Sequence, residues 1–243
     1  FQTANTTMEG LTRIDEDGKV QPGVAESWET SEDGLTWTFK LRKNSTWSNG
    51  TPVTAHDFEY SWKRTLTPET AAEYSYIMAD IVGSSTKEIQ ENGVDGVGVK
   101  ALDDYTLEVK LNRPVAYFAE LVSFQVFFPQ NQAFVESCGD AYGSAADKQL
   151  YNGPFTLTSW KMEDQFTMEK NPNYWDAANV KLNKINTKVV KDTGAEVSLY
   201  EDGQIDRAIL SSDYVDKYKD SKELKTREVA SIFMLQINGG NHK

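Results

Sequence analysis

One short alternating segment constrains the fold of this chain more than any other feature. At positions 36–41 of the 243-residue chain, Thr and Lys alternate with three large apolar residues, Trp37, Phe39 and Leu41. A period of two residues is typical of a β-strand with one buried and one solvated face. The flanking segments 31–34 and 48–50 are built from Ser, Glu, Asp, Asn and Gly, which favour turns. The segment therefore predicts a strand at a sheet edge or in a hairpin.

A helix is predicted shortly after this strand. Thr54 has the residue type of an N-cap, and Asp57 follows three positions later, as in a short-armed capping box. Apolar residues then recur at i, i+4 and i+8, as a buried helical stripe requires, at Phe58, Trp62 and Leu66. The whole segment 54–91 is expected to be mainly helical, with a loop at 66–73.

The rest of the chain shows further strand and helix patterns. Strands are expected in a hairpin of 97–99 with 105–111, in a pair at 153–161 and 165–170, and at 185–190 and 227–237. Helices are expected at 1–12, 117–121 and 193–201. The segment 136–149 is rich in Gly, Ala, Ser and Asp, so we expect it to cross between two lobes.

Composition bounds the size of the core and the class of partner. Hydrophobic residues make up 39% of the chain and aromatic residues 12%, which suffices for one large domain or two small ones. The 25 Lys and Arg residues are outnumbered by 37 Asp and Glu residues, so the formal net charge is −12. Such a charge repels nucleic acids and anionic membrane surfaces on average, and no nucleic-acid partner is expected.

The sequence contains neither a membrane-spanning segment nor an export signal. It contains no apolar run of about 18 residues, the length needed to span a membrane. It opens at Phe1 without a starting Met or an export signal, so we expect any signal to lie upstream. The single cysteine, Cys138, excludes an internal disulfide and is not expected to be a lipid-anchoring residue.

Catalytic and metal-binding patterns are sparse. The two histidines, His56 and His242, have no metal-ligand spacing with the lone cysteine, and no P-loop, nucleophile elbow or dinucleotide fingerprint occurs. The acidic run at 15–18 lacks the Gly that a calcium loop needs at its sixth position, where Val20 stands, so we interpret it as a turn. The acidic pair at 103–104 is also interpreted as a turn. The alternative hypothesis of a glycosidase that uses two carboxylates is left open. No metal and no cofactor are expected.

Binding is better supported than catalysis because aromatic residues are frequent in the predicted loops. Aromatic rings offer wide, rigid contact area, and Tyr and Trp add one polar group. The loop candidates are Tyr74, Tyr76, Phe124, Phe127, Phe128, Tyr142, Tyr151, Trp160, Tyr174 and Trp175. Four other tryptophans lie on patterned elements and are expected to pack in the core, namely Trp28, Trp37, Trp47 and Trp62.

Several motifs, taken in order along the chain, resemble one known family. The clearest are Pro-Gly-Val-Ala-Glu-Ser-Trp at 22–28 and Trp-Ser-Asn-Gly-Thr-Pro-Val-Thr-Ala-His-Asp-Phe at 47–58. Further matching motifs stand at 8–11, 57–64, 101–109, 152–155 and 171–175. Together they resemble the bacterial extracellular solute-binding proteins of family 5, the oligopeptide- and dipeptide-binding proteins of ATP-driven importers. The resemblance covers essentially the whole chain, and the segment 60–71 is most similar to the oligopeptide branch.

The resemblance implies an α/β fold of the periplasmic-binding-protein-like type II class, cluster C. Members of the family are considerably longer than this chain and have a third domain that closes the ligand cleft. The chain is therefore expected to be a fragment with a partial first lobe. Residues 10–133 would form an inserted small domain, residues 1–9 and 134–243 would form part of the first lobe, and the third domain would be absent.

The resemblance also implies a function without catalysis. The protein would be the extracytoplasmic substrate-binding component of an ABC importer, capturing short oligopeptides non-covalently in a two-lobed cleft. A peptide pheromone sensor or a carbohydrate-binding member of the family is an alternative, and a two-carboxylate glycoside hydrolase is the alternative from another class. The expected partners are short peptides and the membrane permease subunits of the transporter. The protein would be a monomer, either periplasmic or anchored to the cytoplasmic membrane of a Gram-positive bacterium as a cell-surface lipoprotein.

Four residues are expected at the peptide site from the resemblance. In the oligopeptide branch, the tyrosine that ends the loop, here Tyr74, lies against the bound peptide. The segment just before Phe1 carries peptide-contacting backbone in relatives, so Phe1, Gln2 and Thr3 are expected beside the site.

Overall fold

The computed structural model describes residues 2–226, so the strand predicted at 227–237 lies outside the described residues. The chain divides into two compact units, Phe1–Lys188 and Val189–Lys243. The domains predicted at 10–133, and at 1–9 with 134–243, stay predictions. Within the described part of the chain, no helix combines the length and the apolar character needed to cross a membrane.

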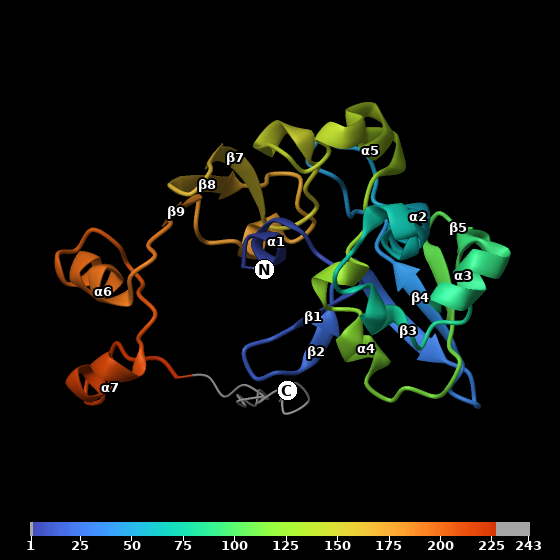
Figure 1. The fold of residues 1–243 in the computed structure, drawn as a ribbon, viewed down its shortest axis with the longest axis horizontal. Helices are drawn as coiled ribbons and strands as arrows, with labels where there is room; N and C mark the ends of the chain where they lie inside the picture. The colour runs from blue at the N-terminus through green and yellow to red at the C-terminus, as the bar shows by residue number, and fades with distance from the viewer. Residues whose placement is uncertain (1, 227–243) are drawn as a thin grey trace, which may run out of the picture. The chain divides into compact units, whose positions relative to one another are not determined.

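A four-stranded antiparallel sheet belongs to the first unit (Figure 1). Its strands lie in the order β3 (Ala25–Thr30), β4 (Thr36–Leu41), β6 (Thr106–Lys110) and β5 (Val99–Asp103). The alternation in β4 places its three apolar side chains in the core, each at most 7% exposed, which confirms the predicted strand. The pairing of β5 with β6 confirms the second predicted hairpin, although β5 runs on to Asp103.

Helix α2 (Ala55–Leu66) begins where the sequence predicts. The backbone N of Thr54 donates a hydrogen bond to Asp57 Oδ2 at 2.8 Å, so the carboxylate satisfies the N-cap amide. The helix stops ahead of Pro68, whose ring disfavours helical backbone at the preceding residue, Thr67. Local sequence therefore determines both ends of this helix.

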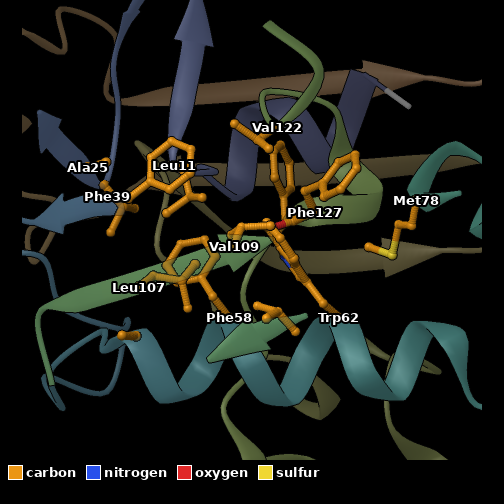
Figure 2. Close-up of a cluster of buried hydrophobic side chains, with 14 of the residues drawn as sticks. Leu11, Ala25, Phe39, Phe58, Trp62, Met78, Leu107, Val109, Val122 and Phe127 are labelled. Atoms are coloured by element: carbon orange, nitrogen blue, oxygen red, sulfur yellow. The ribbon is translucent and has the colours of Figure 1, made fainter. Parts of the chain in front are cut away.

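The core of the first unit lies between α2 and the four-stranded sheet. The predicted stripe of α2 is confirmed, with each side chain at most 7% exposed, at Phe58, Trp62 and Leu66. Figure 2 shows Phe58 and Trp62 pointing from α2 into a cluster that includes Phe39 of β4 and Leu107 of β6. The Trp62 ring packs edge-on to Phe127 at 5.0 Å, and its Nε1 donates to the Phe127 carbonyl oxygen at 2.8 Å. Burial of each such side chain contributes about 1.5–3 kcal/mol to stability.

A second sheet of the first unit has three antiparallel strands, in the order β7 (Phe155–Lys161), β8 (Gln165–Lys170) and β9 (Lys184–Lys188). The β7–β8 pair confirms the predicted strand pair, and β9 ends two residues earlier than predicted. Strands β1 (Thr12–Ile14) and β2 (Val20–Pro22) form a separate hairpin. Its turn is held by Asp15 Oδ1, which accepts hydrogen bonds from the backbone N of Asp17 and Lys19, so the acidic run is a turn as predicted.

Short helical segments connect these strands. In the first unit they include α4 (Phe118–Leu121) and α5 (Gln132–Cys138), with the 3-10 turns η1 (Pro68–Thr70), η3 (Val94–Gly96), η4 (Gln125–Phe127), η5 (Gly139–Ala141), η6 (Ala146–Lys148) and η7 (Ala177–Asn179). The described part of the second unit contains α6 (Thr193–Glu201), as predicted, and α7 (Ser212–Tyr218). Lys217 and Tyr218 of α7 both hydrogen-bond the Glu201 carboxylate at the end of α6.

Two helix predictions are wrong in extent. Helix α1 (Gln2–Thr7) does not reach residue 12, because the Asn152 side chain hydrogen-bonds both the backbone N and the backbone O of Glu9. The helical stretch expected after residue 73 is reduced to the 3-10 turn η2 (Ser75–Met78) and the helix α3 (Thr86–Asn92). Gly83 interrupts it with a φ of +71°, which no right-handed helix contains.

Candidate functional site

Three aromatic side chains contact one another in a row at the loop that carries Tyr74, the residue predicted at the peptide site. The Tyr74 ring lies 5.6 Å from the Phe124 ring in an edge-on arrangement and 6.0 Å from the Tyr76 ring at a tilt of 33°. Tyr74 and Phe124 are partly buried, whereas Tyr76 is 68% exposed. We call these three residues the aromatic row. One of its members is the predicted site residue, and the other two were among the loop aromatics.

The loop that carries Tyr74 is shaped by its own sequence. After α2 ends, Ala71 adopts a left-handed conformation with a φ of 48°, which reverses the chain direction. Met78, at the end of η2, and Ile81, just beyond it, are at most 1% exposed and anchor the far end of the loop in the core. On the other side, Phe124 lies three residues after the end of α4, and its backbone N donates to the Leu121 carbonyl oxygen. The row therefore rests on two anchored segments.

The loop around the row is negatively charged. Residues 65–86 contain no Lys or Arg, and their acidic members are Glu69, Glu73 and Asp80. Asp80 forms a two-pronged ion pair with Arg113, with nitrogen–oxygen distances of 2.7 and 2.8 Å. Glu69 and Glu73 are exposed, so the surface near the row has an acidic character.

The N-terminal residues predicted at the site belong to a different element, helix α1. Phe1 lies outside the described residues, and Gln2 and Thr3 open helix α1. Thr3 is partly buried, and its carbonyl oxygen accepts a hydrogen bond from Thr7 Oγ1 at 3.0 Å. Helix α1 packs against β7, and Tyr74 contacts the rings of Tyr76 and Phe124 among the described residues. That all four residues face one ligand stays a prediction.

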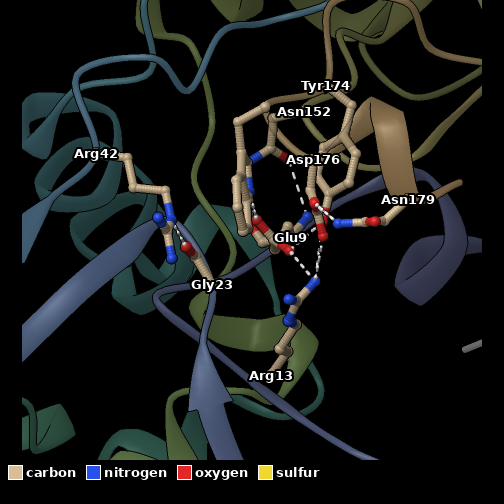
Figure 3. Close-up of polar contacts among 9 residues, drawn as sticks. Glu9, Arg13, Gly23, Arg42, Asn152, Tyr174, Asp176 and Asn179 are labelled. Carbon is tan, nitrogen blue, oxygen red and sulfur yellow. Dashed lines mark hydrogen bonds and ion pairs between the residues drawn. The ribbon is translucent and has the colours of Figure 1, made fainter.

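A buried carboxylate that the sequence analysis missed lies beside α1. Glu9 is only 6% exposed, and both of its carboxylate oxygens accept hydrogen bonds, from Tyr174 Oη at 2.5 Å and from Trp175 Nε1 at 2.6 Å. Arg13 lies 3.7 Å from one of these oxygens and 3.5 Å from Asp176 (Figure 3). We call this group the Glu9 cluster, made of Glu9, Arg13, Arg42, Asn152, Tyr174, Trp175 and Asp176.

Arginine and asparagine side chains extend the Glu9 cluster to neighbouring segments. The Arg42 guanidinium stacks over the Trp175 ring, with Cζ 3.8 Å from the ring centroid, and its Nε donates to the Gly23 carbonyl oxygen at 2.7 Å. Asn152 accepts from the backbone N of Glu9 at 3.0 Å and donates to the Glu9 carbonyl oxygen at 2.9 Å. The cluster therefore joins the N-terminal segment to the end of β4 and to the chain on either side of the β7–β8 pair.

Backbone packing beside the Glu9 cluster is very close. A Cβ added to Gly153 would lie 2.6 Å from the backbone N of Met8 and 2.6 Å from the carbonyl carbon of Thr7. The backbone N of Gly153 donates to the Thr7 carbonyl oxygen at 3.0 Å. Asn171 Nδ2 donates in turn to the Gly153 carbonyl oxygen at 2.9 Å. Only glycine fits at this crossing of two chain segments.

Burial shifts the acidity of this cluster. Desolvation raises the pKa of Glu9 above its usual value, although hydrogen bonds from Tyr174 and Trp175 and the charges of Arg13 and Arg42 oppose the shift. Burial and the neighbouring carboxylate raise the pKa of Tyr174 as well. A raised carboxyl pKa is common at catalytic sites. Here, however, both oxygens are engaged and almost no carboxylate surface is exposed, so Glu9 is placed to hold structure rather than to attack a substrate.

The other candidate chemistry is confined to the surface. Asp103 Oδ1 accepts from the backbone N of Tyr105 at 2.8 Å, so the acidic pair at 103–104 is a turn, as interpreted. His56 lies 3.4 Å from Asp104 with both side chains mostly exposed. Among residues 2–226, no group of three or more His, Cys, Asp or Glu side chains is arranged to hold a metal ion.

Two open cavities lie away from the aromatic row. One, of about 460 Å³, borders the polar face of α2 at His56, Lys63 and Arg64. The other, of about 510 Å³, lies at the end of the four-stranded sheet near Lys40 and Asp104. Neither is lined by a residue of the row or of the Glu9 cluster.

Three of the motifs quoted for the family resemblance meet in or beside the Glu9 cluster. They are the segments 8–11, 152–155 and 171–175, which contribute Glu9, Asn152 with Gly153, and Asn171 with Tyr174 and Trp175. The only sequence signal for this cluster was that each of the three segments matched a motif of the family. Sequence alone did not reveal that they contact one another.

The chain matches a known family model over almost its whole length. The model described as "Bacterial extracellular solute-binding proteins, family 5 Middle" matches residues 19–242. The dipeptide-binding protein DppE of Bacillus subtilis is 37% identical over 98% of this chain. The oligopeptide-binding protein OppA of the same species is 38% identical over 96% of the chain. The chain spans 44% of the length of each of these relatives.

The chain is also similar to solved structures of peptide-binding proteins. The substrate-binding domain of an oligopeptide ABC transporter from Bacillus anthracis is 48% identical, with a TM-score of 0.87 over 91% of this chain and 43% of that chain. OppA of Listeria monocytogenes, bound to peptide, is 42% identical, with a TM-score of 0.85 over 90% of this chain and 44% of that chain. The pheromone receptor PrgZ is 34% identical, with a TM-score of 0.86 over 91% of this chain and 45% of that chain. These likenesses confirm the predicted α/β fold class and the prediction that the chain is part of such a fold.

Proposed function

Because the chain belongs to the bacterial extracellular solute-binding proteins of family 5, we propose that the protein containing it captures short peptides outside the cytoplasm and delivers them to an ABC importer. The family is one of solute-binding proteins, and the relatives above are named as binding proteins, a substrate-binding domain and a receptor rather than as enzymes, which confirms the prediction of a protein without catalysis. A glycoside hydrolase therefore has no support.

One observation carries the proposal. This chain is 42% identical, over 90% of its length, to OppA of Listeria monocytogenes, which was solved with peptide bound. The aromatic row offers this chain a contact surface for a peptide, because the Tyr74 ring contacts two other rings and Tyr76 is open to solvent. We propose that Tyr74 contacts the peptide, and that Phe1, Gln2 and Thr3 lie beside it.

The proposed capture uses two walls. The chain supplies one wall, and a third domain, as in the longer members of the family, supplies the other, so that the peptide is enclosed in a two-lobed cleft. Main-chain hydrogen bonds to an extended peptide give affinity with little sequence preference. The proposed partners are peptides and the permease subunits of the importer. The proposed form is a monomer outside the cytoplasm, either periplasmic or anchored as a lipoprotein.

A peptide sensor is the second candidate. It is favoured by the similarity to the pheromone receptor PrgZ, which has a TM-score of 0.86 against this chain. Transport and sensing share the binding step and differ in the fate of the bound peptide. A carbohydrate-binding role, the other alternative within the family, has no comparable observation in its favour.

Calorimetry of the full-length protein tests the proposal. A mixed pool of tri- to pentapeptides is expected to bind with a Kd of about 1 μM or tighter, which corresponds to about −8 kcal/mol. A panel of oligosaccharides is the control and is expected to give no binding heat. Binding of the sugars but not of the peptides would contradict the proposal. Uptake of labelled peptide by cells with and without the permease then separates transport from sensing.

A further inference from the structure

We infer that Tyr76 is a specificity-determining contact that favours peptides with an aromatic side chain at one position. This inference rests on the proposed function of peptide capture and names a selectivity of that same site. Tyr76 has no role in the expectations drawn from the family resemblance, where Tyr74 alone represents this loop.

The first step is the combination of exposure and support at Tyr76. A single exposed tyrosine is ordinary on a protein surface. Tyr76, however, is 68% exposed while its ring contacts that of Tyr74 at 6.0 Å, and Tyr74 in turn contacts Phe124 at 5.6 Å. Two residues further on, Met78 is 1% exposed and fixes the end of η2 in the core. The exposed Tyr76 ring is therefore restrained by its contact with the Tyr74 ring and by a backbone segment that Met78 anchors in the core.

The second step is the energetic advantage of a ring that is already positioned. A flexible surface side chain loses rotamer freedom when a ligand packs on it, and this loss reduces affinity. Contact with Tyr74 limits that freedom before any ligand arrives. The exposed part of the Tyr76 ring thus presents a flat apolar surface at small entropic cost, and an aromatic side chain of a ligand fits it best by stacking or edge-on packing.

The third step is the exclusion of other ligand classes at this position. Asp80 is paired with Arg113, but Glu69 and Glu73 are exposed on the same loop and disfavour an acidic ligand side chain near Tyr76. A small apolar side chain reaches only a little of the ring. An aromatic side chain therefore gains more from the row than an acidic or a small apolar one, and a pairwise ring contact corresponds to about a three- to tenfold gain in affinity.

The experiment measures peptide affinity of the full-length protein by calorimetry. The peptides are trialanine and the three tripeptides in which one Ala is replaced by Phe. Wild-type protein is expected to bind one of the Phe peptides about three- to tenfold more tightly than trialanine. In Tyr76→Ala this preference is expected to disappear, because the affinity for the favoured Phe peptide falls by more than the affinity for trialanine. Tyr76→Phe keeps the ring and is expected to keep the preference.

Two further variants make the test specific. Tyr117→Ala removes another exposed tyrosine, 52% exposed and outside the row, and is expected to leave the preference intact. Tyr76→Leu keeps apolar bulk without a ring and serves if Tyr76→Ala fails to fold, with loss of most of the preference expected. Equal preference in wild type and Tyr76→Ala, or an equal loss for all four peptides, overturns the inference while the proposed function stands. Absence of binding to any peptide by the wild type overturns both.

Discussion

The Glu9 cluster and the aromatic row reverse the usual distribution of side chains. The cluster holds a carboxylate at 6% exposure, and the row holds a tyrosine at 68% exposure. The buried acid is tolerated because each of its oxygens has a donor and because two arginines lie near it. The exposed Tyr76 ring has no comparable structural role, because it is not part of the hydrophobic core. The buried acid is therefore assigned a structural role, and the exposed ring is the part for which we propose a role in binding.

Removing the buried acid gives the largest expected effect. Glu9→Ala leaves the Tyr174 hydroxyl and the Trp175 indole N–H without their acceptor in the interior and is expected to lower the free energy of unfolding by about 3 kcal/mol. Glu9→Gln keeps an acceptor oxygen and is expected to cost about 1 kcal/mol. Urea unfolding at neutral pH measures both. Glu29→Ala, on the exposed side of β3, is the control and should stay within about 0.5 kcal/mol of wild type. Equal effects of the two alanine variants would show that the cluster does not hold structure.

A methyl group at the chain crossing tests the cluster from its backbone side. Gly153→Ala places a Cβ 2.6 Å from backbone atoms of residues 7 and 8, and relief of that clash is expected to cost about 2 kcal/mol. Thermal unfolding monitored by circular dichroism reports the loss. Gly96→Ala is the matched control, because its nearest neighbour, Asn92 Cβ, lies at 3.4 Å. A Tm for Gly153→Ala no lower than that of the control would contradict the close packing.

Truncating Tyr74, the central ring of the row, should weaken peptide affinity and leave the free energy of unfolding nearly unchanged. Tyr74→Ala in the full-length protein is expected to weaken peptide affinity by about 1 kcal/mol, or about fivefold, as for a contact of ordinary strength. Tyr74→Phe retains the ring contacts and should bind as wild type does. The affinities come from calorimetry and the stabilities from urea unfolding. Unchanged affinity with an intact fold would remove Tyr74 from the site.

The smallest expected effect is a pH dependence that belongs to the cluster. The pKa of Glu9 is raised in the folded state by desolvation, so the native protein binds a proton at a pH where the unfolded chain does not. Its contribution to stability is therefore present below the usual pKa of 4.5 and is lost as the pH rises through the raised value. Unfolding free energies of wild type and Glu9→Gln, measured from pH 7 down to pH 5, should diverge in favour of the wild type. Parallel profiles would indicate that the pKa of Glu9 is not raised.

Sequence predicts the elements whose causes are local and misses those whose causes are distant. The alternation in β4 and the cap and stripe of α2 depend on neighbouring residues, and the structure confirms them. The helix expected through residue 12 fails because Asn152, 143 positions away from Glu9, takes its backbone hydrogen bonds. The site shows the same limit. Tyr74 was selected through the resemblance, but its contact with Phe124, and hence the row, depends on tertiary structure.

The length of chain enclosed by the Glu9 cluster has a consequence for the order of folding. The hydrogen bonds that Glu9 makes with Asn152, Tyr174 and Trp175 join residues 143 to 166 positions apart, so closing this loop costs on the order of 4 kcal/mol of chain entropy before any contact repays it. The hairpins β3–β4 and β5–β6 close much shorter loops. We therefore expect these two hairpins to form before the Glu9 cluster, and the cluster to form after the transition state. Substitutions in the cluster would then mainly accelerate unfolding, so the cluster governs how long the folded protein persists rather than how quickly it forms.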